Sequence, residues 1–192
     1  MMRAILVGII VLMAGTVGWI TFQRYRLDNS GEAYGAPFTL VDGHGQPITQ
    51  AAFRGHPSLL YFGYTHCPEV CPTTLFELDG WLKQLGPEAK DMKAFFISID
   101  PERDTPEVMN RYLSNFSDRI TGISGPPDKV RAMAKGFNIY FRKVETDGGD
   151  YTMDHTASII LLDRSGDFAG TIAYGESEKA ALAKLKRLEA GA

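Results

Sequence analysis

The pattern of this 192-residue chain predicts an α/β domain built around a mixed β-sheet. Apolar runs typical of buried strands alternate with amphipathic helical stretches over the middle of the chain, which predicts parallel strand pairs. Hairpin patterns precede and follow this alternation, and they add antiparallel strands. With 44% hydrophobic residues, the chain has enough apolar material for one domain with a core, plus an appendage.

The domain begins with a predicted hairpin. Residues 37–41 alternate apolar and polar side chains, as a half-buried strand does. Asp42-Gly43-His44-Gly45 is a turn signal, and residues 47–49 predict the returning strand. The next strand, Ser58–Gly63, is an apolar run that we expect to be buried on both faces.

A helix follows, with Pro72 as its first residue, because the N–H group that proline lacks would be unpaired there. Leucines recur at helical spacing along it, and Gly86-Pro87 ends it. Another buried strand is predicted over Lys93–Asp100.

A second helix begins at Pro106, with Asp104 or Thr105 as its cap. A short strand is predicted at residues 120–124, and a third helix covers residues 126–136.

The last part of the domain is mainly β-structure. Residues 139–144 predict a strand, and the Gly-rich residues 145–150 a loop. Residues 158–162 and 167–173 predict a closing hairpin, and Ser177 caps a final helix.

This order of elements is that of a thioredoxin-like fold with an additional N-terminal β-hairpin. It places Cys67 and Cys71, the two cysteines of the chain, where a strand ends and a helix begins. The positive end of the helix dipole lowers the pKa of a thiol there, which favours redox chemistry or metal binding.

The cysteine pair allows three interpretations. A structural disulfide over so short a loop contributes only about 2 kcal/mol, which a domain of this size does not need. Disulfide exchange of the thioredoxin kind uses Cys-x-x-Cys, whereas Cys67 and Cys71 are separated by three residues. Thiolates at i and i+4 share one helical face, so both sulfurs can reach a single ion, and sulfur favours Cu(I) or Zn.

Four histidines are candidates for a third ligand. His44 lies in a turn and His56 in a loop before a proline. His66 adjoins Cys67, but neighbouring residues seldom point to the same centre, so we expect it to shape the loop or tune the thiols. In a thioredoxin-like fold, His155 lies where a cis-proline would face the cysteines, and it is the preferred candidate.

The N-terminal residues 4–22 contain no charged side chain, and a helix of this length spans about 28 Å, close to the hydrocarbon thickness of a bilayer. A single transmembrane helix is the favoured interpretation. A cleaved signal peptide has a shorter apolar core, and a helix buried in the domain would have a polar face. The net charge of −3 and the mixing of charges give no indication of nucleic-acid binding.

Three motifs together resemble the Sco family, also called SenC/PrrC. They are Gly63-Tyr64-Thr65-His66-Cys67-Pro68-Glu69-Val70-Cys71-Pro72, Asp100-Pro101-Glu102-Arg103-Asp104-Thr105-Pro106 and Asp154-His155-Thr156. The resemblance covers the domain from about Pro37 to Leu188 and includes the single N-terminal anchor.

The resemblance implies a thioredoxin-like domain that binds one copper ion, Cu(I) or Cu(II), through Cys67, Cys71 and His155. Asp154, Asp100 and Arg103 are then expected near the ligands or facing a partner, as is His66 from the loop. The same two cysteines are also the expected redox-active disulfide.

The resemblance also implies an organisation and a location. Residues 1–26 form the membrane anchor, residues 27–36 a linker and residues 37–192 the copper-binding domain. The protein is then a single-pass protein of the bacterial inner membrane with its domain in the periplasm.

The implied function is that of a metallochaperone, without catalytic residues, that delivers copper to the binuclear site of cytochrome c oxidase subunit II. Another periplasmic copper chaperone is a possible donor. Two alternatives stay open: a thiol–disulfide reductase for the cysteines of that site, and a redox or copper sensor.

Overall fold

The computed structural model describes residues 13, 15–20 and 34–191, and the chain divides into two units, Met1–Glu32 and Ala33–Ala192. The described residues of the first unit are helical. Within the described residues, no helix is long and apolar enough to cross a membrane. Most of the predicted span, residues 4–22, lies outside them, so the anchor stays a prediction.

The second unit contains a seven-stranded mixed sheet with the strand order β2-β1-β5-β4-β3-β8-β9. The strands are β1 (Thr39–Asp42), β2 (Pro47–Thr49), β3 (Ser58–Gly63), β4 (Lys93–Ser98), β5 (Ile120–Ser124), β8 (Ile159–Leu162) and β9 (Phe168–Ile172). Strand β4 is parallel to both β3 and β5, and the other pairs are antiparallel. The predicted mixed sheet is therefore confirmed, and the leading hairpin extends it beyond β5.

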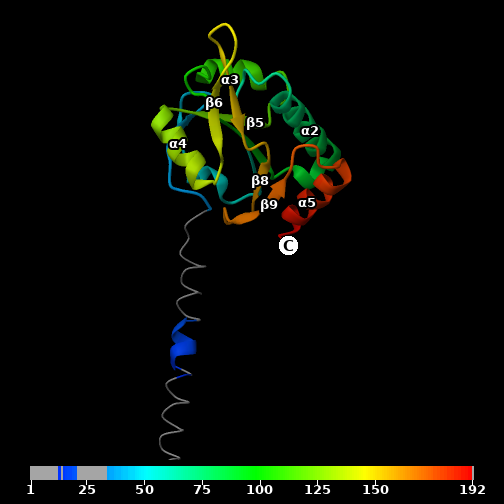
Figure 1. The fold of residues 1–192 in the computed structure, drawn as a ribbon. Helices are drawn as coiled ribbons and strands as arrows, with labels where there is room; N and C mark the ends of the chain where they lie inside the picture. The colour runs from blue at the N-terminus through cyan, green and yellow to red at the C-terminus, as the bar shows by residue number, and fades with distance from the viewer. Residues whose placement is uncertain (1–12, 14, 21–33, 192) are drawn as a thin grey trace, which may run out of the picture. The chain divides into compact units, whose positions relative to one another are not determined.

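Four α-helices cover this sheet, with α2 and α5 packed against each other on one side and α4 on the other (Figure 1). They are α2 (Val70–Leu85), α3 (Pro106–Leu113), α4 (Pro127–Gly136) and α5 (Glu178–Ala190), and two 3-10 turns cover Gln50–Phe53 and Gly86–Ala89. Thr105 and Ser177 cap α3 and α5 by accepting N–H bonds from Val108 and Ala180.

The core lies against β3, all six residues of which are buried. Phe53 is fully buried and packs edge-on against Phe95 and Phe137. Tyr34, at the end of the predicted linker, packs against Phe137 and Phe168. The central strand that leads to the cysteines is thus held rigidly by apolar packing on both faces.

Two expectations about local structure were wrong. Helix α2 begins at Val70, so Pro72 is its third residue; a proline is still tolerated there, because none of the first four N–H groups has a partner within the helix. No element was predicted between the loop at residues 145–150 and the strand at residues 158–162, but residues 151–155 form strand β7 (Tyr151–His155), which pairs with β6 (Phe141–Glu145).

The β6–β7 hairpin forms a separate two-stranded sheet that shares no ladder with the seven-stranded one. It carries His155 at its base, opposite Phe141. The position of His155 therefore depends on side-chain contacts and on the connections at the base of the hairpin.

Candidate metal centre

The two cysteines lie at the start of helix α2. The preceding residue, Glu69, makes no side-chain cap, and the Cys71 backbone N–H instead donates to Cys67 Sγ at 3.3 Å. The sulfur therefore takes the place that a serine or aspartate oxygen occupies at other helix starts. Both thiols are free, with Cys71 buried and Cys67 partly exposed.

The end of strand β3 gives Cys71 its space. A Cβ atom at Gly63 would lie 2.9 Å from Cys71 Sγ and 2.8 Å from the Phe96 ring. Tyr61, also on β3, donates its hydroxyl to Cys71 Sγ at 3.6 Å. A glycine at position 63 is thus required for the buried sulfur to occupy this position.

His155 approaches the thiols from strand β7. Its Nε2 lies 3.6 Å from Cys71 Sγ, and its Nδ1 lies 2.9 Å from the Thr156 carbonyl oxygen. Because a carbonyl can only accept, Nδ1 carries the proton and Nε2 keeps its lone pair for the centre. The imidazole ring packs edge-on against Tyr61 and Tyr64, with centroid distances of 6.3 and 5.9 Å.

The two thiols differ strongly in acidity. The pKa of Cys67 is lowered to about 4, chiefly by the hydrogen bond from Cys71, against the opposing effect of burial, and with a further contribution from His155. The hydrogen bond to Cys67, burial and the charge of Cys67 raise the pKa of Cys71. At neutral pH the metal-free pair therefore shares one proton, with the negative charge on the more exposed sulfur.

Among the described residues, Cys67, Cys71 and His155 form the one group of three such side chains arranged to hold a metal ion. Their ligand atoms all lie within 4.8 Å of one another. Two sulfurs and one imidazole nitrogen suit Cu(I) or Zn, while a structural zinc site takes a fourth protein ligand. The donor set thus fits a soft ion bound by three protein ligands.

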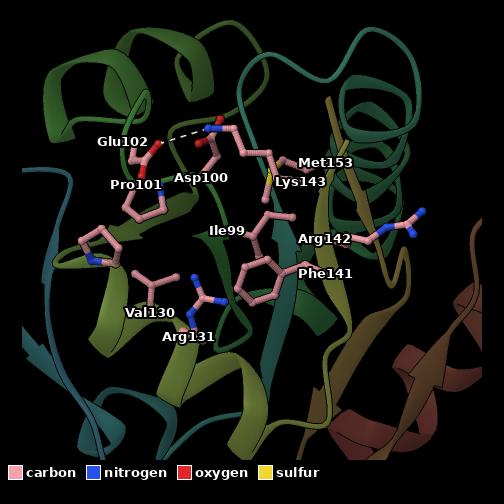
Figure 2. A pocket seen from close by; sticks show the side chains of 11 residues that line it. Ile99, Asp100, Pro101, Glu102, Val130, Arg131, Phe141, Arg142, Lys143 and Met153 are labelled. Carbon is pink, nitrogen blue, oxygen red and sulfur yellow. Dashed lines mark ion pairs between the residues drawn. The ribbon is translucent and has the colours of Figure 1, made fainter. Parts of the chain in front are cut away.

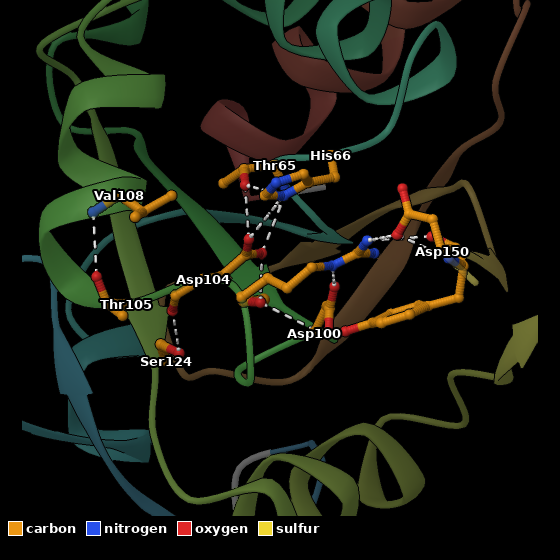
Figure 3. A network of polar contacts seen from close by, with 11 residues as sticks. Thr65, His66, Asp100, Asp104, Thr105, Val108, Ser124 and Asp150 are labelled. Atoms are coloured by element: carbon orange, nitrogen blue, oxygen red, sulfur yellow. Dashed lines mark hydrogen bonds and ion pairs between the residues drawn. The ribbon is translucent and has the colours of Figure 1, made fainter. Parts of the chain in front are cut away.

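The other predicted site residues lie outside this group. His66 faces Thr65 and Asp104, with its Nδ1 at 3.1 Å from Thr65 Oγ1 (Figure 3). Asp154 pairs with Arg142 at 2.8 Å on the exposed side of the hairpin.

Asp100 and Arg103 form an ion pair that is almost entirely buried at the carboxylate. Their partners are each other and the β6–β7 hairpin, not the thiols. Both residues lie on the loop between β4 and α3, so the second motif contacts the centre indirectly.

Sequence reasoning missed the role of Asp104. Its fully buried carboxylate accepts hydrogen bonds from Thr65 N–H at 3.1 Å, Thr65 Oγ1 at 2.6 Å and Ser98 Oγ at 2.7 Å. Asp104 thereby ties the cysteine loop to the loop after β4 (Figure 3). Its two possible uses, as a helix cap or as a link between loops, look the same in sequence.

A cavity of about 370 Å³ adjoins the hairpin (Figure 2). Met153, two residues before His155, lines it together with Ile99, Val130 and Phe141. The Glu102–Lys143 ion pair lies at its edge. Met153 is thus a core side chain of the hairpin face.

The fold and the three clustered side chains define a class: a thioredoxin-like domain with a two-cysteine, one-histidine donor set. The SCO1/SenC family model matches residues 27–190, and the chain belongs to this family.

Known relatives agree with this assignment. The chain is 34% identical over 196 residues to the mitochondrial protein SCO2 of Saccharomyces cerevisiae, covering 94% of this chain and 64% of that protein. It thus spans less than two thirds of that relative's length. The copper-bound structure of Bradyrhizobium japonicum ScoI is 46% identical, with a TM-score of 0.75, over 81% of this chain and 99% of that one.

A second structure, of BsSco, is described as belonging to the Sco family of cytochrome c oxidase assembly proteins. It is 22% identical, with a TM-score of 0.65, over 82% of this chain and 95% of that one, and supports the fold alone.

Proposed function

We propose that this protein is a membrane-anchored metallochaperone that binds copper and delivers it to the binuclear site of cytochrome c oxidase subunit II. The clustering of Cys67, Cys71 and His155 carries the proposal, because this donor set suits copper. Copper bound by a 46% identical relative and membership of the family support it.

The geometry supports transfer by ligand exchange. Cys67 is partly exposed and is the more acidic of the two thiols, so a partner cysteine can displace it first. Cys71 and His155 then hold the ion from the interior side until the partner has supplied further ligands. The acceptor is thus expected to bring soft ligands of its own, as a binuclear copper site with cysteines does.

The anchor at residues 1–26, the linker at residues 27–36 and a periplasmic domain on the bacterial inner membrane belong to the same proposal. Copper arrives from another periplasmic chaperone. In this arrangement the protein turns over no substrate.

Copper titration tests the proposal. The reduced protein is expected to bind one copper ion with a sulfur-to-copper charge-transfer band, and His155→Ala is expected to lower the affinity sharply. His44→Ala, a histidine outside the centre, is the matched control. Copper binding that is equal in the His155→Ala variant and in the unaltered protein would remove His155 from the site.

The acidity of Cys67 also favours a second candidate, a thiol–disulfide reductase. The Cys67 thiolate would attack a disulfide of the oxidase site, which releases one partner thiolate and leaves a mixed disulfide. Cys71 would then lose its proton and attack Cys67 Sγ in the mixed disulfide, which releases the second partner sulfur. The partner leaves with two thiols and this protein with a disulfide, which a periplasmic dithiol must reduce.

A deletion strain separates the two candidates. Recovery of oxidase activity with added copper supports delivery, whereas recovery only with a thiol reductant supports the reductase.

A further inference from the structure

Arg103 links the body of the domain to the β6–β7 hairpin. Its Nε donates to Asp100 Oδ2 at 2.5 Å, and its Nη1 donates to the Tyr151 carbonyl oxygen at 3.1 Å and to Asp150 Oδ1 at 3.2 Å. Asp100 also accepts a bond from the Tyr151 hydroxyl at 2.8 Å. Asp100 and Asp150, which both accept hydrogen bonds from the Arg103 side chain, are labelled in Figure 3.

The guanidinium group of Arg103 also contacts two aromatic rings. It is 3.6 Å from the centroid of the Tyr151 ring and 5.9 Å from that of Tyr64. Lys143 Nζ, from the other strand of the hairpin, is also 3.6 Å from the Tyr151 centroid. Such cation–π contacts strengthen where water is excluded, and the Arg103 side chain is only 17% exposed.

Tyr64 carries this contact to the centre. Its buried ring stands edge-on to the His155 imidazole, with an interplanar angle of 86°. The series Tyr151, Arg103, Tyr64 and His155 is therefore continuous, and it begins and ends on strand β7. Neither Arg103 nor Tyr151 belongs to the group of ligand atoms.

The hairpin needs such a support because it shares no ladder with the main sheet. The thiols are fixed by β3 and α2, whereas His155 is fixed by the hairpin. We propose that Arg103 is a positioning residue for copper binding: it holds Tyr64 against the His155 ring and the hairpin against the loop after β4. This inference rests on the proposed copper-binding function.

The double variant Arg103→Met, Asp100→Asn tests it without leaving a buried carboxylate unpaired. Copper affinity, measured by competition with a chromophoric chelator, is expected to fall about 10- to 100-fold, as for other residues that orient a ligand. The sulfur-to-copper charge-transfer band is expected to shift, because the nitrogen ligand is displaced. Arg142→Met, which removes the exposed ion pair with Asp154 in the same hairpin, is the matched control and is expected to match the unaltered protein.

A double-mutant cycle separates positioning from general destabilisation. In a His155→Ala background, the Arg103→Met, Asp100→Asn change is expected to cause no further loss, because the ligand that it orients is absent. If the change lowers copper affinity by the same factor in the presence and in the absence of His155, the inference is overturned.

Tyr151→Phe and Tyr151→Leu provide a second, independent pair. The phenylalanine keeps the ring against Arg103 and is expected to bind copper nearly as the unaltered protein does; the leucine is expected to lose affinity. If the unaltered protein binds no copper, the proposed function fails. If it binds copper through His155 and the Arg103 and Tyr151→Leu variants bind as tightly, the inference alone fails.

Discussion

Replacing Asp104 with alanine is expected to destabilise the domain by about 3 kcal/mol. The change leaves three donors, Thr65 N–H, Thr65 Oγ1–H and Ser98 Oγ–H, without their acceptor in a fully buried position. A buried donor without a partner costs about 1–3 kcal/mol, and we expect the two hydroxyls to rotate and recover part of this cost. With a urea dependence of about 2 kcal/mol/M, the unfolding midpoint would fall by about 1.5 M.

Asp104→Asn separates the hydrogen bonds from the charge. The amide oxygen still accepts from Thr65, so a loss of only about 1 kcal/mol is expected. Burial raises the pKa of Asp104, against the opposing bonds from Thr65 and Ser98. A raised pKa of an acid favours the folded state below its unfolded pKa, and this contribution is lost as pH rises. The free energy of unfolding of the Asp104→Asn variant should therefore increase relative to that of the unaltered protein as the pH rises from below about 4 to neutral.

Urea denaturation followed by circular dichroism gives the measurement, with Asp79→Ala as the control. Asp79 is also a buried carboxylate, but its ion-pair partner is the exposed Lys83, so a much smaller change is expected. An Asp104→Ala midpoint equal to that of the unaltered protein would refute the reasoning. The reasoning would also be refuted if Asp104→Ala and Asp79→Ala lowered the unfolding midpoint by the same amount.

Three further predictions follow from the centre and the helix ends. Alkylation of Cys67 by iodoacetamide should keep its rate from neutral pH down to near pH 5 and slow only as the pH approaches the thiol pKa of about 4. Cys71→Ala removes the side-chain donor to Cys67 and should move this loss of rate to higher pH. A rate for the unaltered protein that rises tenfold per pH unit from pH 6 to 8 would contradict the low pKa. Tyr61→Phe removes the hydroxyl that donates to Cys71 Sγ. Copper affinity, measured by chelator competition, should fall several-fold, and the free energy of unfolding in urea should fall by about 1 kcal/mol. If neither value changes, the hydrogen bond contributes nothing. Thr105→Ala removes the cap of α3, and Ser177→Ala removes that of α5. Each change should lower the free energy of unfolding in urea by about 1 kcal/mol. No loss in either variant would show that these caps are dispensable.

Most of the main sheet was predictable because its strands are marked by their own residues. Strands β2, β3 and β5 have the predicted bounds. Apolar runs closed by glycine, proline or aspartate determine such bounds locally. Strand order and register depend on packing between distant segments, which local patterns do not report.

Strand β7 was missed although its sequence alternates. Tyr151, Met153 and His155 share one face, and a Gly-rich turn separates them from β6. The pattern is short and contains Asp154, a residue uncommon in strands, so the neighbouring loop signal prevailed. The strand exists because it pairs with β6 and packs onto the loop after β4.

The juxtaposition of Cys67, Cys71 and His155 was expected from sequence, and the structure brings the three together. The contacts of Asp100, Arg103 and Asp104 could not be predicted from the sequence, because a charged residue after a strand can face solvent, a ligand or another loop. Only the three-dimensional arrangement distinguishes these alternatives.

The centre takes its sulfurs from the start of helix α2 and its histidine from strand β7, and this separation in the chain has a consequence for folding. Cys71 and His155 lie 84 residues apart in the chain, so an ion held by both would close a loop of that length. A clip of this kind disfavours the unfolded chain, and longer loops gain more from it. The copper-bound protein should then resist proteolysis and heat, with a free energy of unfolding that rises with the logarithm of the free copper concentration, and the copper-free protein should be the better substrate for proteases. The lifetime of the protein in the cell would then depend on whether copper is bound.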